Sequence, residues 1–389
     1  MKKAYGIISS VLALSAAASL CGCTGQGEEQ TTDMQSETSI TQTDAETEKV
    51  PHGPGIRAVS PENGQTVSLL NEEMTKWLSA YKPARLDKIC DFTEKCEPVP
   101  VTLRWENDYS PLYSHVLISR SADMSDPAIY LCAAEQLEVR DLYAGVRYYW
   151  QLISECGDKT VASAVFTFET AAQPRTVAID GVSNARDIGG YPTKDGKRVK
   201  QGVVYRGADF SKITAEGINK AVNVLGIKTE LDLRDRNKKG PSPLGENVKL
   251  IAVSAPWYGG AFEEGYKQDL INELRVFTDQ ENFPVYFHCS LGRDRTGTLA
   301  FLLLALCGVE KNDIYKDYEV SFFSDFGGYD DRTEPSFMVN SNLDAFRKSI
   351  LSKTKEKDLQ AAVRSYLISV GMTEAELDAI VDNLTEAAQ

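Results

Sequence analysis

The amino-acid sequence predicts an all-β sandwich over residues 57–172, followed by an α/β domain over residues 174–389. In the first region, short segments of alternating apolar and polar residues are separated by turn residues, which is typical of antiparallel strands. In the second region, strand-like segments alternate with helical ones, which favours a parallel sheet. A third observation locates the candidate functional site. Near residue 289, the pattern predicts a buried strand, then a polar loop, then a strongly apolar helix.

The amino terminus has the pattern of a targeting segment. The two lysines after Met1 precede an apolar stretch at 7–18, which is too short to span a membrane comfortably. The segment at 20–23 reads Leu-Cys-Gly-Cys and resembles a bacterial lipobox, in which cleavage before the last cysteine leaves it to carry lipid. We therefore expect residues 1–23 to be a lipoprotein signal peptide and Cys23 to anchor the protein to the outer side of the cell membrane. An ordinary cleaved secretion signal is the alternative.

Amino-acid composition indicates where a flexible linker lies and which classes of partner and cofactor are disfavoured. Residues 24–56 are rich in Thr, Glu, Gln, Ser and Asp and contain no aromatic residue, so we expect a flexible linker. The formal net charge of −14 argues against a nucleic-acid partner, because phosphate backbones repel an acidic surface. The three histidines, His52, His115 and His288, lie far apart, which disfavours a metallophosphatase, and we expect neither metal nor cofactor.

The first domain is predicted from strand-like segments at 101–105, 115–119, 148–153 and 164–168. The stretch 142–150 resembles a fibronectin type III segment, with Tyr148 at the position of its corner tyrosine and Trp105 at that of its core tryptophan. Residues 70–97 form an atypical insertion that carries Trp77. We expect a fibronectin type III-like spacer or binding module whose partner the sequence does not identify.

Six cysteines remain if Cys21 leaves with the signal and Cys23 is acylated. Four of them lie in the first domain: Cys90, Cys96, Cys132 and Cys156. A location outside the cytoplasm permits up to two disulfides among these four, in a pairing that stays open, and free buried thiols are the alternative. Cys307 lies in an apolar helical segment and is expected to be inert.

The second domain is predicted from strands at 202–206, 227–233 and 249–253 and helices at 214–225, 266–278 and 373–384. Thr214 is expected to cap the first of these helices. The decisive unit is a strand at 285–289, a polar loop and a helix at 296–307. A helix that starts after such a loop points unpaired N–H groups and the positive end of its dipole at the loop, which predicts an anion site.

The loop contains the residues that phosphate-ester chemistry requires. A nucleophilic cysteine must be a thiolate, and the helix amides together with Arg293 and Arg295 favour that form of Cys289. In a loop curled around a phosphate, the spacing lets the Arg295 guanidinium fork two oxygens while the sulfur faces phosphorus. The amides predicted to bind the equatorial oxygens belong to Ser290, Leu291, Gly292, Arg293, Asp294 and Arg295.

Three neighbouring residues are assigned supporting roles. Gly292 is expected to relieve the backbone strain of so tight a curl. His288 is expected to orient the backbone, and Thr296 to donate to the sulfur when a phosphocysteine breaks down.

The motif from His288 to Gly297 resembles the signature of protein-tyrosine-phosphatase-like enzymes, and within them a bacterial group that acts on phosphotyrosine and phosphoinositides. Further similarity lies at 184–191, 204–208, 232–234 and 317–321. The resemblance covers residues 174–389 and implies a metal-independent phosphomonoesterase with a phosphocysteine intermediate. It implies a phosphorylated protein or a phosphoinositide as substrate. Arg293 stands where that group has Lys, which keeps the charge but changes its reach.

The leaving oxygen needs a proton donor, which suits a carboxylic acid. Eukaryotic tyrosine phosphatases use an Asp on a separate Trp-Pro-Asp loop, where this chain has Ala-Pro-Trp-Tyr at 255–258. The resemblance to the bacterial group instead implies Asp294 as general acid and then general base. The fallback candidates are Glu319, Asp325, Asp330 and Asp331.

Four further charged residues, Arg186, Asp187, Arg206 and Arg234, have two interpretations. They add positive potential near the phosphate, or they form ion pairs that brace the sheet, and we favour the bracing role.

Two alternative functions for the protein remain open. An inositol-polyphosphate phosphatase with the same loop chemistry would need a strongly basic pocket, and a surface ligand-binding lipoprotein with an inactive phosphatase domain would show no turnover.

Overall fold

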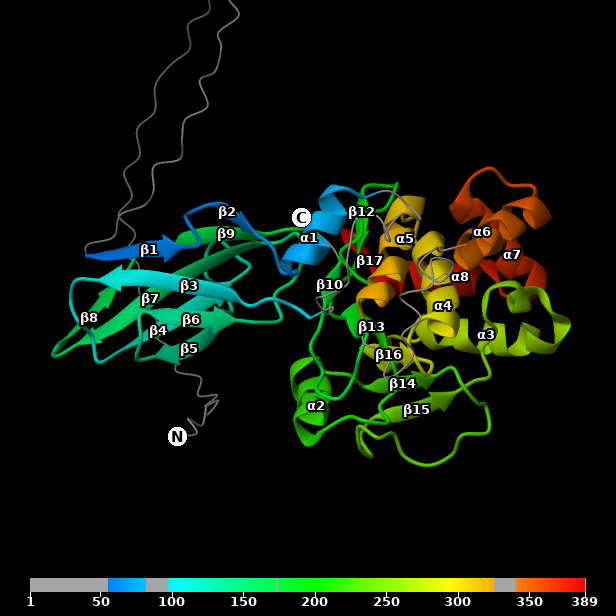
Figure 1. The fold of residues 1–389 in the computed structure, drawn as a ribbon, viewed down its shortest axis with the longest axis horizontal. Helices are drawn as coiled ribbons and strands as arrows, with labels where there is room; N and C mark the ends of the chain where they lie inside the picture. Colours follow the sequence, from blue (N-terminus) through cyan, green and yellow to red (C-terminus); the bar gives the residue numbers. More distant parts are fainter. Residues whose placement is uncertain (1–54, 82–96, 173, 325–340, 389) are drawn as a thin grey trace, which may run out of the picture. The chain divides into compact units, whose positions relative to one another are not determined.

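A computed structural model describes residues 55–81, 97–172, 174–324 and 341–388 (Figure 1). The predicted signal peptide with Cys23, the cysteines at 90 and 96, and the fallback acids at 325, 330 and 331 lie outside the described residues. The described chain folds first into a β-sandwich and then into an α/β region. Both architectures that the sequence predicts are therefore present, in the predicted order.

The sandwich consists of two sheets. One has the strand order β1-β3-β6 and the other β2-β9-β7-β4-β5, with β8 paired to β7. The strands are β1 Ile56–Ser60, β2 Gln65–Val67, β3 Val101–Asn107, β4 Tyr113–Ser119, β5 Ala128–Cys132, β6 Gln136–Val139, β7 Arg147–Cys156, β8 Lys159–Ala162 and β9 Phe166–Thr170. Their inward-facing residues form one apolar cluster, which includes the aromatic side chains of Trp105, Tyr148, Trp150, Phe166 and Phe168.

Tyr148 connects a loop of the sandwich to strand β7. Its hydroxyl accepts a hydrogen bond from the backbone N–H of Tyr143 at 2.8 Å, and its ring stacks on Phe168 with centroids 5.4 Å apart. A corner tyrosine bonds in this way to backbone a few residues upstream. Cys132 and Cys156 carry free thiols, so neither forms a disulfide in the described structure.

A helix from the amino-terminal region packs one face against the core of the α/β region. Helix α1 (Glu72–Ser79) begins at Asn71, whose side chain accepts a hydrogen bond from the Met74 N–H at 2.9 Å. Met74 and Trp77 are fully buried in the α/β core, where the Trp77 ring centroid lies 5.2 Å from that of Phe323. Helix α1, from the insertion that the sequence assigns to the first domain, therefore packs its apolar face on the second.

The α/β sheet has six strands in the order β10-β11-β13-β16-β14-β15. They are β10 Arg175–Thr176, β11 Arg186–Asp187, β13 Val204–Gly207, β14 Thr229–Asp232, β15 Lys249–Ala252 and β16 Val285–His288. The last four in this order are parallel, as predicted, whereas β10 and β11 add an antiparallel edge. The register places Gly207, Asp232 and His288 side by side at the carboxyl end of the sheet. A separate ribbon joins β12 (Lys197–Val199) to β17 (Thr385–Ala387).

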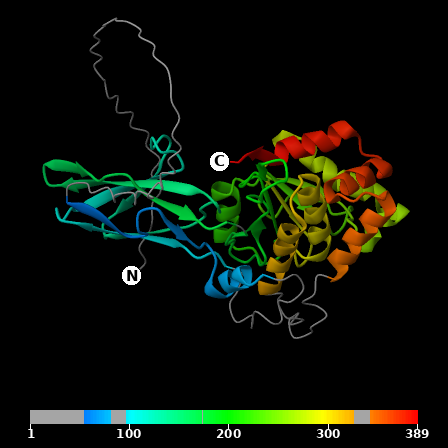
Figure 2. The same ribbon diagram turned by 90° about the horizontal axis from the view of Figure 1, so that it is seen from above.

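Helices cover both faces of this sheet. On the face that carries Tyr205 and Tyr286, α2 (Ala215–Asn219) is capped by the Thr214 hydroxyl and continues as a π-helix over Lys220–Val224. The other face is covered by α3 Lys267–Arg275, α4 Asp294–Leu306, α5 Lys311–Glu319, α6 Ser341–Thr354, α7 Leu359–Val370 and α8 Glu374–Leu384. Figures 1 and 2 show these helices gathered beside the sheet. Short 3-10 helices lie at Tyr258–Phe262, Glu264–Tyr266, Val276–Thr278, Gln280–Asn282 and Val320–Phe323.

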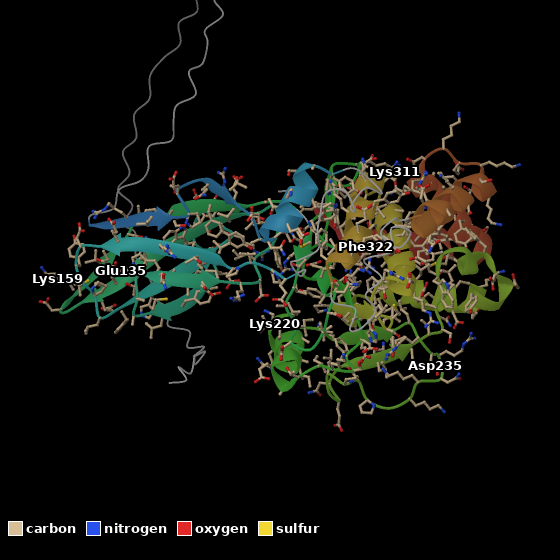
Figure 3. All side chains as sticks on the ribbon, in the orientation of Figure 1. Glu135, Lys159, Lys220, Asp235, Lys311 and Phe322 are labelled. Carbon is tan, nitrogen blue, oxygen red and sulfur yellow. The ribbon has the colours of Figure 1, made fainter. Side chains whose placement is uncertain are left out.

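Helix α4 is the centre of the α/β core. Every residue from Thr296 to Leu306 is buried, as expected for a helix that is apolar on all sides. Phe322, labelled in Figure 3, belongs to the same core. Within the described residues, no helix combines the length and the apolar character needed to cross a membrane.

Candidate active site

A cradle forms where β16 ends and α4 begins. The loop 289–293 connects His288, at the end of the strand, to Asp294, the first residue of the helix. Gly292 has a φ of +73°, and a Cβ at this position would lie 2.3 Å from the Gly207 carbonyl at the end of β13. Glycine alone tolerates both the left-handed backbone and the close approach.

The backbone carbonyls of residues 289–292 all accept hydrogen bonds from groups that lie outside the curled loop. Their partners, in chain order, are His288 Nδ1 at 3.1 Å, the Asp209 N–H at 3.3 Å, Asn184 Nδ2 at 2.9 Å and Arg206 Nη2 at 2.8 Å. Because these carbonyls are drawn outward, the amides of the same segment turn towards the inside of the curl. Successive amides turned to one side make a concave anion-binding surface.

A cavity of 680 Å³ opens over this loop. Its lining residues are Trp257, Tyr258, Gly259, Gly260, Cys289, Ser290, Leu291, Asp294, Arg295 and Asn342. The structure thus brings the three predicted catalytic residues into one cavity, together with four of the six predicted amide donors, because Asp294 and Arg295 belong to both groups. Gly292 and Arg293 are not among the lining residues: the first shapes the curl, and the side chain of the second contacts Asp294.

Arg295 lies beside the aromatic wall of the cavity. Its Cζ is 4.7 Å from the centroid of the Trp257 ring, a cation–π distance, and its Nη1 donates to the Arg234 carbonyl at 3.4 Å. Trp257 is 46% exposed, so much of its ring remains open beside the guanidinium. The cavity therefore offers a cation and an aromatic surface next to the sulfur of Cys289.

Asp294 faces the cavity with a side chain that is 34% exposed. Its carboxylate accepts hydrogen bonds from Tyr258 Oη at 2.7 Å and from Arg293 Nε at 3.1 Å. Burial, followed by the nearby Tyr318 and Asp294, raises the pKa of Tyr258 well above its ordinary value, so this phenol is a neutral donor. The first turn of a helix also stabilises a negative charge.

Asp317 of α5 joins two buried arginines behind the loop. Arg186 Nε lies 3.1 Å from Asp317 Oδ1, and Arg206 Nη1 lies 2.5 Å from Asp317 Oδ2. Burial and the like charge of Arg186 lower the pKa of Arg206 to about 10, against the opposing effect of Asp317. Since Arg206 also donates to the Gly292 carbonyl, these ion pairs brace the loop.

Asp187 makes its contacts on the other side of β11. It pairs with Arg175 at 2.5 Å and accepts hydrogen bonds from the N–H groups of Gly189 and Gly202 at 2.7 and 2.6 Å. Burial raises the pKa of Asp187, and the Arg175 charge opposes this rise. Asp187 does not line the cavity, so its contacts fix the chain around β11.

His288 connects the loop to the neighbouring strand. Its ring is fully buried, with Nε2 at 3.0 Å from Glu230 Oε1 on β14 and Nδ1 at 3.1 Å from the Cys289 carbonyl. These two contacts fix the orientation of the ring between β14 and the loop. Burial alone would raise the pKa of Glu230, but hydrogen bonds from His288 and Ser242 lower it.

Asp232 organises the cations at the end of β14. It pairs with Arg234 at 2.8 Å and with Lys238 at 2.7 Å. Burial would raise the pKa of Asp232, but the hydrogen bonds from Arg234 and Lys238 and the charge of His288 hold it well below its usual range. Glu230, Asp232 and His288 have ligand atoms within 4.8 Å of one another, a spacing that suits a metal ion. The Lys238 ammonium already contacts both carboxylates there, and Arg234 is a bracing residue at this edge.

Two further predictions concern Thr296, as a donor to the sulfur of Cys289, and Cys307, as an inert residue. The Thr296 hydroxyl is buried and has no hydrogen-bond partner within the part of the chain that the structure describes, so the predicted bond to Cys289 is not formed here. Cys307, at the end of α4, is buried, and burial raises its pKa to about 12. Its thiol is neutral, which agrees with a packing role.

Sequence reasoning missed the residues that reach the site from other elements. These are Asn184, Glu230, Trp257, Tyr258, Asp317 and Tyr318. A signal existed for five of them. Three lie in the segments 184–191 and 317–321, which resemble the bacterial group, and two lie in the segment 255–258, which replaces the separate acid loop of eukaryotic enzymes. A search of that segment for aromatic residues, and not only for an acid, would have found Trp257 and Tyr258.

The protein-tyrosine-phosphatase-like class is defined by three features that this site has. A cysteine follows a central parallel strand, an arginine lies in the first turn of the next helix, and a curled loop connects the two. The model of the tyrosine phosphatase family matches residues 177–386, more than half of the sequence. The chain belongs to this family.

Individual relatives cover smaller parts of the chain. A protein of Cupriavidus necator named as a putative tyrosine-protein phosphatase is 30% identical, over 36% of this chain and 61% of its own length. A tyrosine-protein phosphatase of Nostoc commune is 29% identical, over 30% of this chain and 47% of its own length. The chain thus spans about half to three-fifths of these relatives. The catalytic core of the PP-IP phosphatase Siw14 from S. cerevisiae shares 20% identity over 42% of this chain and 94% of that one; its TM-score of 0.25 is too low to support an argument.

Proposed function

We propose that the chain is a metal-independent phosphomonoesterase that hydrolyses phosphotyrosine in proteins. The observation that carries this proposal is the cavity that Cys289, Asp294 and Arg295 share, above a loop whose carbonyls are drawn outward. Nucleophile, proton donor and phosphate-binding cation are the groups that the reaction requires. Membership of the tyrosine phosphatase family supports the same chemistry.

The reaction takes two steps. In the first, the Cys289 thiolate attacks phosphorus, the bond from phosphorus to the aryl oxygen breaks, and Asp294 gives its proton to that oxygen. In the second, water attacks the phosphocysteine, Asp294 accepts its proton, and the phosphorus–sulfur bond breaks to release inorganic phosphate and the thiolate. Arg295 and the loop amides bind the other phosphate oxygens, whose negative charge they stabilise in both transition states.

The walls of the cavity favour an aryl monophosphate. Trp257 exposes an aromatic surface on which a substrate ring can stack, next to the cation that binds the phosphate. Arg295 is the one cationic side chain among the described lining residues, whereas an inositol polyphosphate needs several. The lipobox-like Cys23 favours phosphoinositides as a second substrate class, because a lipid-anchored enzyme meets lipid head groups at the membrane.

Turnover of three phosphates, with and without excess chelator, tests the proposal. We expect a phosphotyrosine peptide to be hydrolysed fastest, phosphoinositide vesicles more slowly, and inositol hexakisphosphate least, with no effect of the chelator. Absence of turnover would favour a ligand-binding role, and loss of turnover on chelation would exclude metal-independent chemistry. Fastest hydrolysis of the hexakisphosphate would favour the inositol-polyphosphate alternative.

We also propose that Cys23 carries lipid, that the folded part lies outside the cytoplasm at the cell membrane, and that the sandwich is fibronectin type III-like. The apolar stretch before Cys23 supports the first two points, and the Tyr148–Tyr143 contact with the division into two sheets supports the third. A fatty-acid analogue should label the full chain in cells and should not label the Cys23→Ala variant. Equal labelling of the two would refute the anchor.

A further inference from the structure

Tyr258 contacts Asp294 from a segment that the proposed mechanism does not use. The phenol donates to the Asp294 carboxylate at 2.7 Å, and the Tyr258 backbone N–H donates to Thr298 Oγ1 at 2.9 Å. The Thr298 hydroxyl in turn donates to the Asp294 carbonyl at 2.9 Å. One residue therefore holds Asp294 through its side chain directly and through its backbone by way of Thr298.

Tyr318 of α5 completes this arrangement from behind. Its hydroxyl is hydrogen-bonded to the Tyr258 hydroxyl, and both side chains are buried. Because the single hydroxyl hydrogen of Tyr258 points at Asp294, Tyr318 is the donor in the bond between the two phenols. The chain of hydrogen bonds runs from Tyr318 to Tyr258 to the carboxylate, and each bond polarises the next.

Two positions make this contact possible, one through its backbone conformation and one through the absence of a side chain. Tyr258 has a φ of +49°, in the left-handed region that bulky residues seldom adopt. Gly297 gives Tyr318 its space, since a Cβ there would lie 2.8 Å from the Tyr318 ring. Strained backbone of this kind persists where the surrounding structure holds it in place, and such places cluster at functional sites.

We propose that Tyr258, supported by Tyr318, is a positioning residue that aims the Asp294 carboxyl at the leaving oxygen and stabilises the carboxylate formed when its proton has left. The inference rests on the proposed function. Arg293 also contacts this carboxylate, but from the neighbouring residue in the chain, so Tyr258 supplies the one described contact that fixes the carboxylate from another element. A residue that positions the proton donor should affect the rate most when the leaving group is poor, because a good leaving group departs without a proton.

The test compares Tyr258→Phe with the unaltered chain on phenyl phosphate and on 2,4-dinitrophenyl phosphate. We expect kcat/KM to fall about tenfold on phenyl phosphate, which is the effect of one hydrogen bond to a charged group, and less than about twofold on the dinitrophenyl ester. In an Asp294→Asn background, Tyr258→Phe should cause no further selective loss. Tyr315→Phe is the matched control, since Tyr315 is a buried phenol that donates to the Asp344 carboxylate at 2.5 Å, outside the lining of the cavity. It should leave both rates unchanged.

The outcomes separate the inference from the function on which it rests. An equal loss on both esters, no loss on either, or a selective loss that persists beside Asp294→Asn would overturn the role of Tyr258 alone. If the unaltered chain hydrolyses neither ester, the proposed function falls and the inference falls with it. Circular dichroism and urea unfolding of Tyr258→Phe show whether a loss of rate reflects a loss of fold.

Discussion

Gly292 occupies a position where any side chain would collide with a neighbouring strand. A Cβ there would lie 2.3 Å from Gly207, and the backbone has a φ of +73°. We expect Gly292→Ala to abolish turnover and to lower the free energy of unfolding by more than the roughly 1 kcal/mol that left-handed backbone alone costs an alanine. Steady-state kinetics and urea unfolding measure the two effects.

Gly240 provides the matched control for this steric argument. It also has a positive φ, +109°, but nothing lies within 4 Å of the position of its Cβ. Gly240→Ala should therefore lower the free energy of unfolding by about 1 kcal/mol and leave turnover intact. Equal effects of the two substitutions would mean that the backbone angle, and not the contact with Gly207, requires glycine at residue 292.

The two buried cysteines of the α/β region should differ sharply in function. Cys289 lines the cavity, whereas Cys307 lies at the far end of α4, where burial raises its pKa to about 12. We expect Cys289→Ser to lower kcat by about a thousandfold or more, because a serine hydroxyl has no base here to activate it. Cys307→Ala should keep turnover and lose about 1 kcal/mol of stability, as removal of a small buried group does. Turnover retained by Cys289→Ser would exclude the cysteine mechanism.

The sequence could reveal Cys289, Asp294 and Arg295 because they stand within one segment of seven residues, where spacing alone fixes their relation. Tyr258 and Tyr318 come from two other segments. Their approach to Asp294 depends on how a 3-10 turn and helix α5 pack on α4, which no local pattern encodes. The same holds for the outward contacts of the loop carbonyls, since the partners come from the segment before β11, from β13 and the residues just after it, and from the end of β16.

At the scale of elements, strand β14 holds a carboxylate whose ionisation should make stability depend on pH. Asp232 is fully buried, and its partners Arg234 and Lys238 hold its pKa below the unfolded value. Its ionised form therefore contributes stability above about pH 4, and this contribution is lost as the pH falls through the lowered folded pKa. Asp232→Asn should be clearly less stable than the unaltered chain at pH 7, with a gap that narrows towards pH 2.

Urea unfolding at a series of pH values measures this gap. Asp235→Asn is a suitable control, because Asp235 is an exposed carboxylate three residues further along the chain. It should change the urea midpoint little at any pH. A gap between Asp232→Asn and the unaltered chain that stays constant from pH 7 to pH 2 would show that lost packing, and not lost charge, destabilises the variant.

Elements with a strong local pattern were predictable, and those defined by their neighbours were not. The apolar strand at β16 and the apolar helix α4 follow from runs of buried residues, and Thr214 marks the start of α2. The two-residue strands β10 and β11 have no recognisable pattern, because each is a strand only through its neighbour: β11 pairs with β13, and β10 pairs with β11. Helix α2 ends early, since its second half widens into a π-helix where it packs on the sheet.

At the scale of the whole molecule, the amino-terminal region and the α/β region are joined by contacts that a division into two domains does not suggest. Gln201 bonds to both the N–H and the carbonyl of Ala144 at 2.8 Å. Helix α1 makes a larger contact, because it contributes Met74 and Trp77 to the α/β core. The sequence places Trp77 in an insertion of the first domain, but the domain that buries it depends on the tertiary fold.

Trp77 should therefore support the stability of the catalytic region, although it precedes most of the sandwich in the chain. Its ring is fully buried beside Phe323, at the end of the segment that carries Tyr318. We expect Trp77→Ala to lower the free energy of unfolding by about 3–5 kcal/mol, the usual effect of removing a large buried aromatic ring. Turnover of an aryl phosphate should then be lost at a lower urea concentration. Leu112→Ala, at a sandwich position that is 79% exposed, should leave that concentration unchanged. If Trp77→Ala shifted only the unfolding of the sandwich, α1 would belong energetically to the first domain, and the shared core would not couple the two regions.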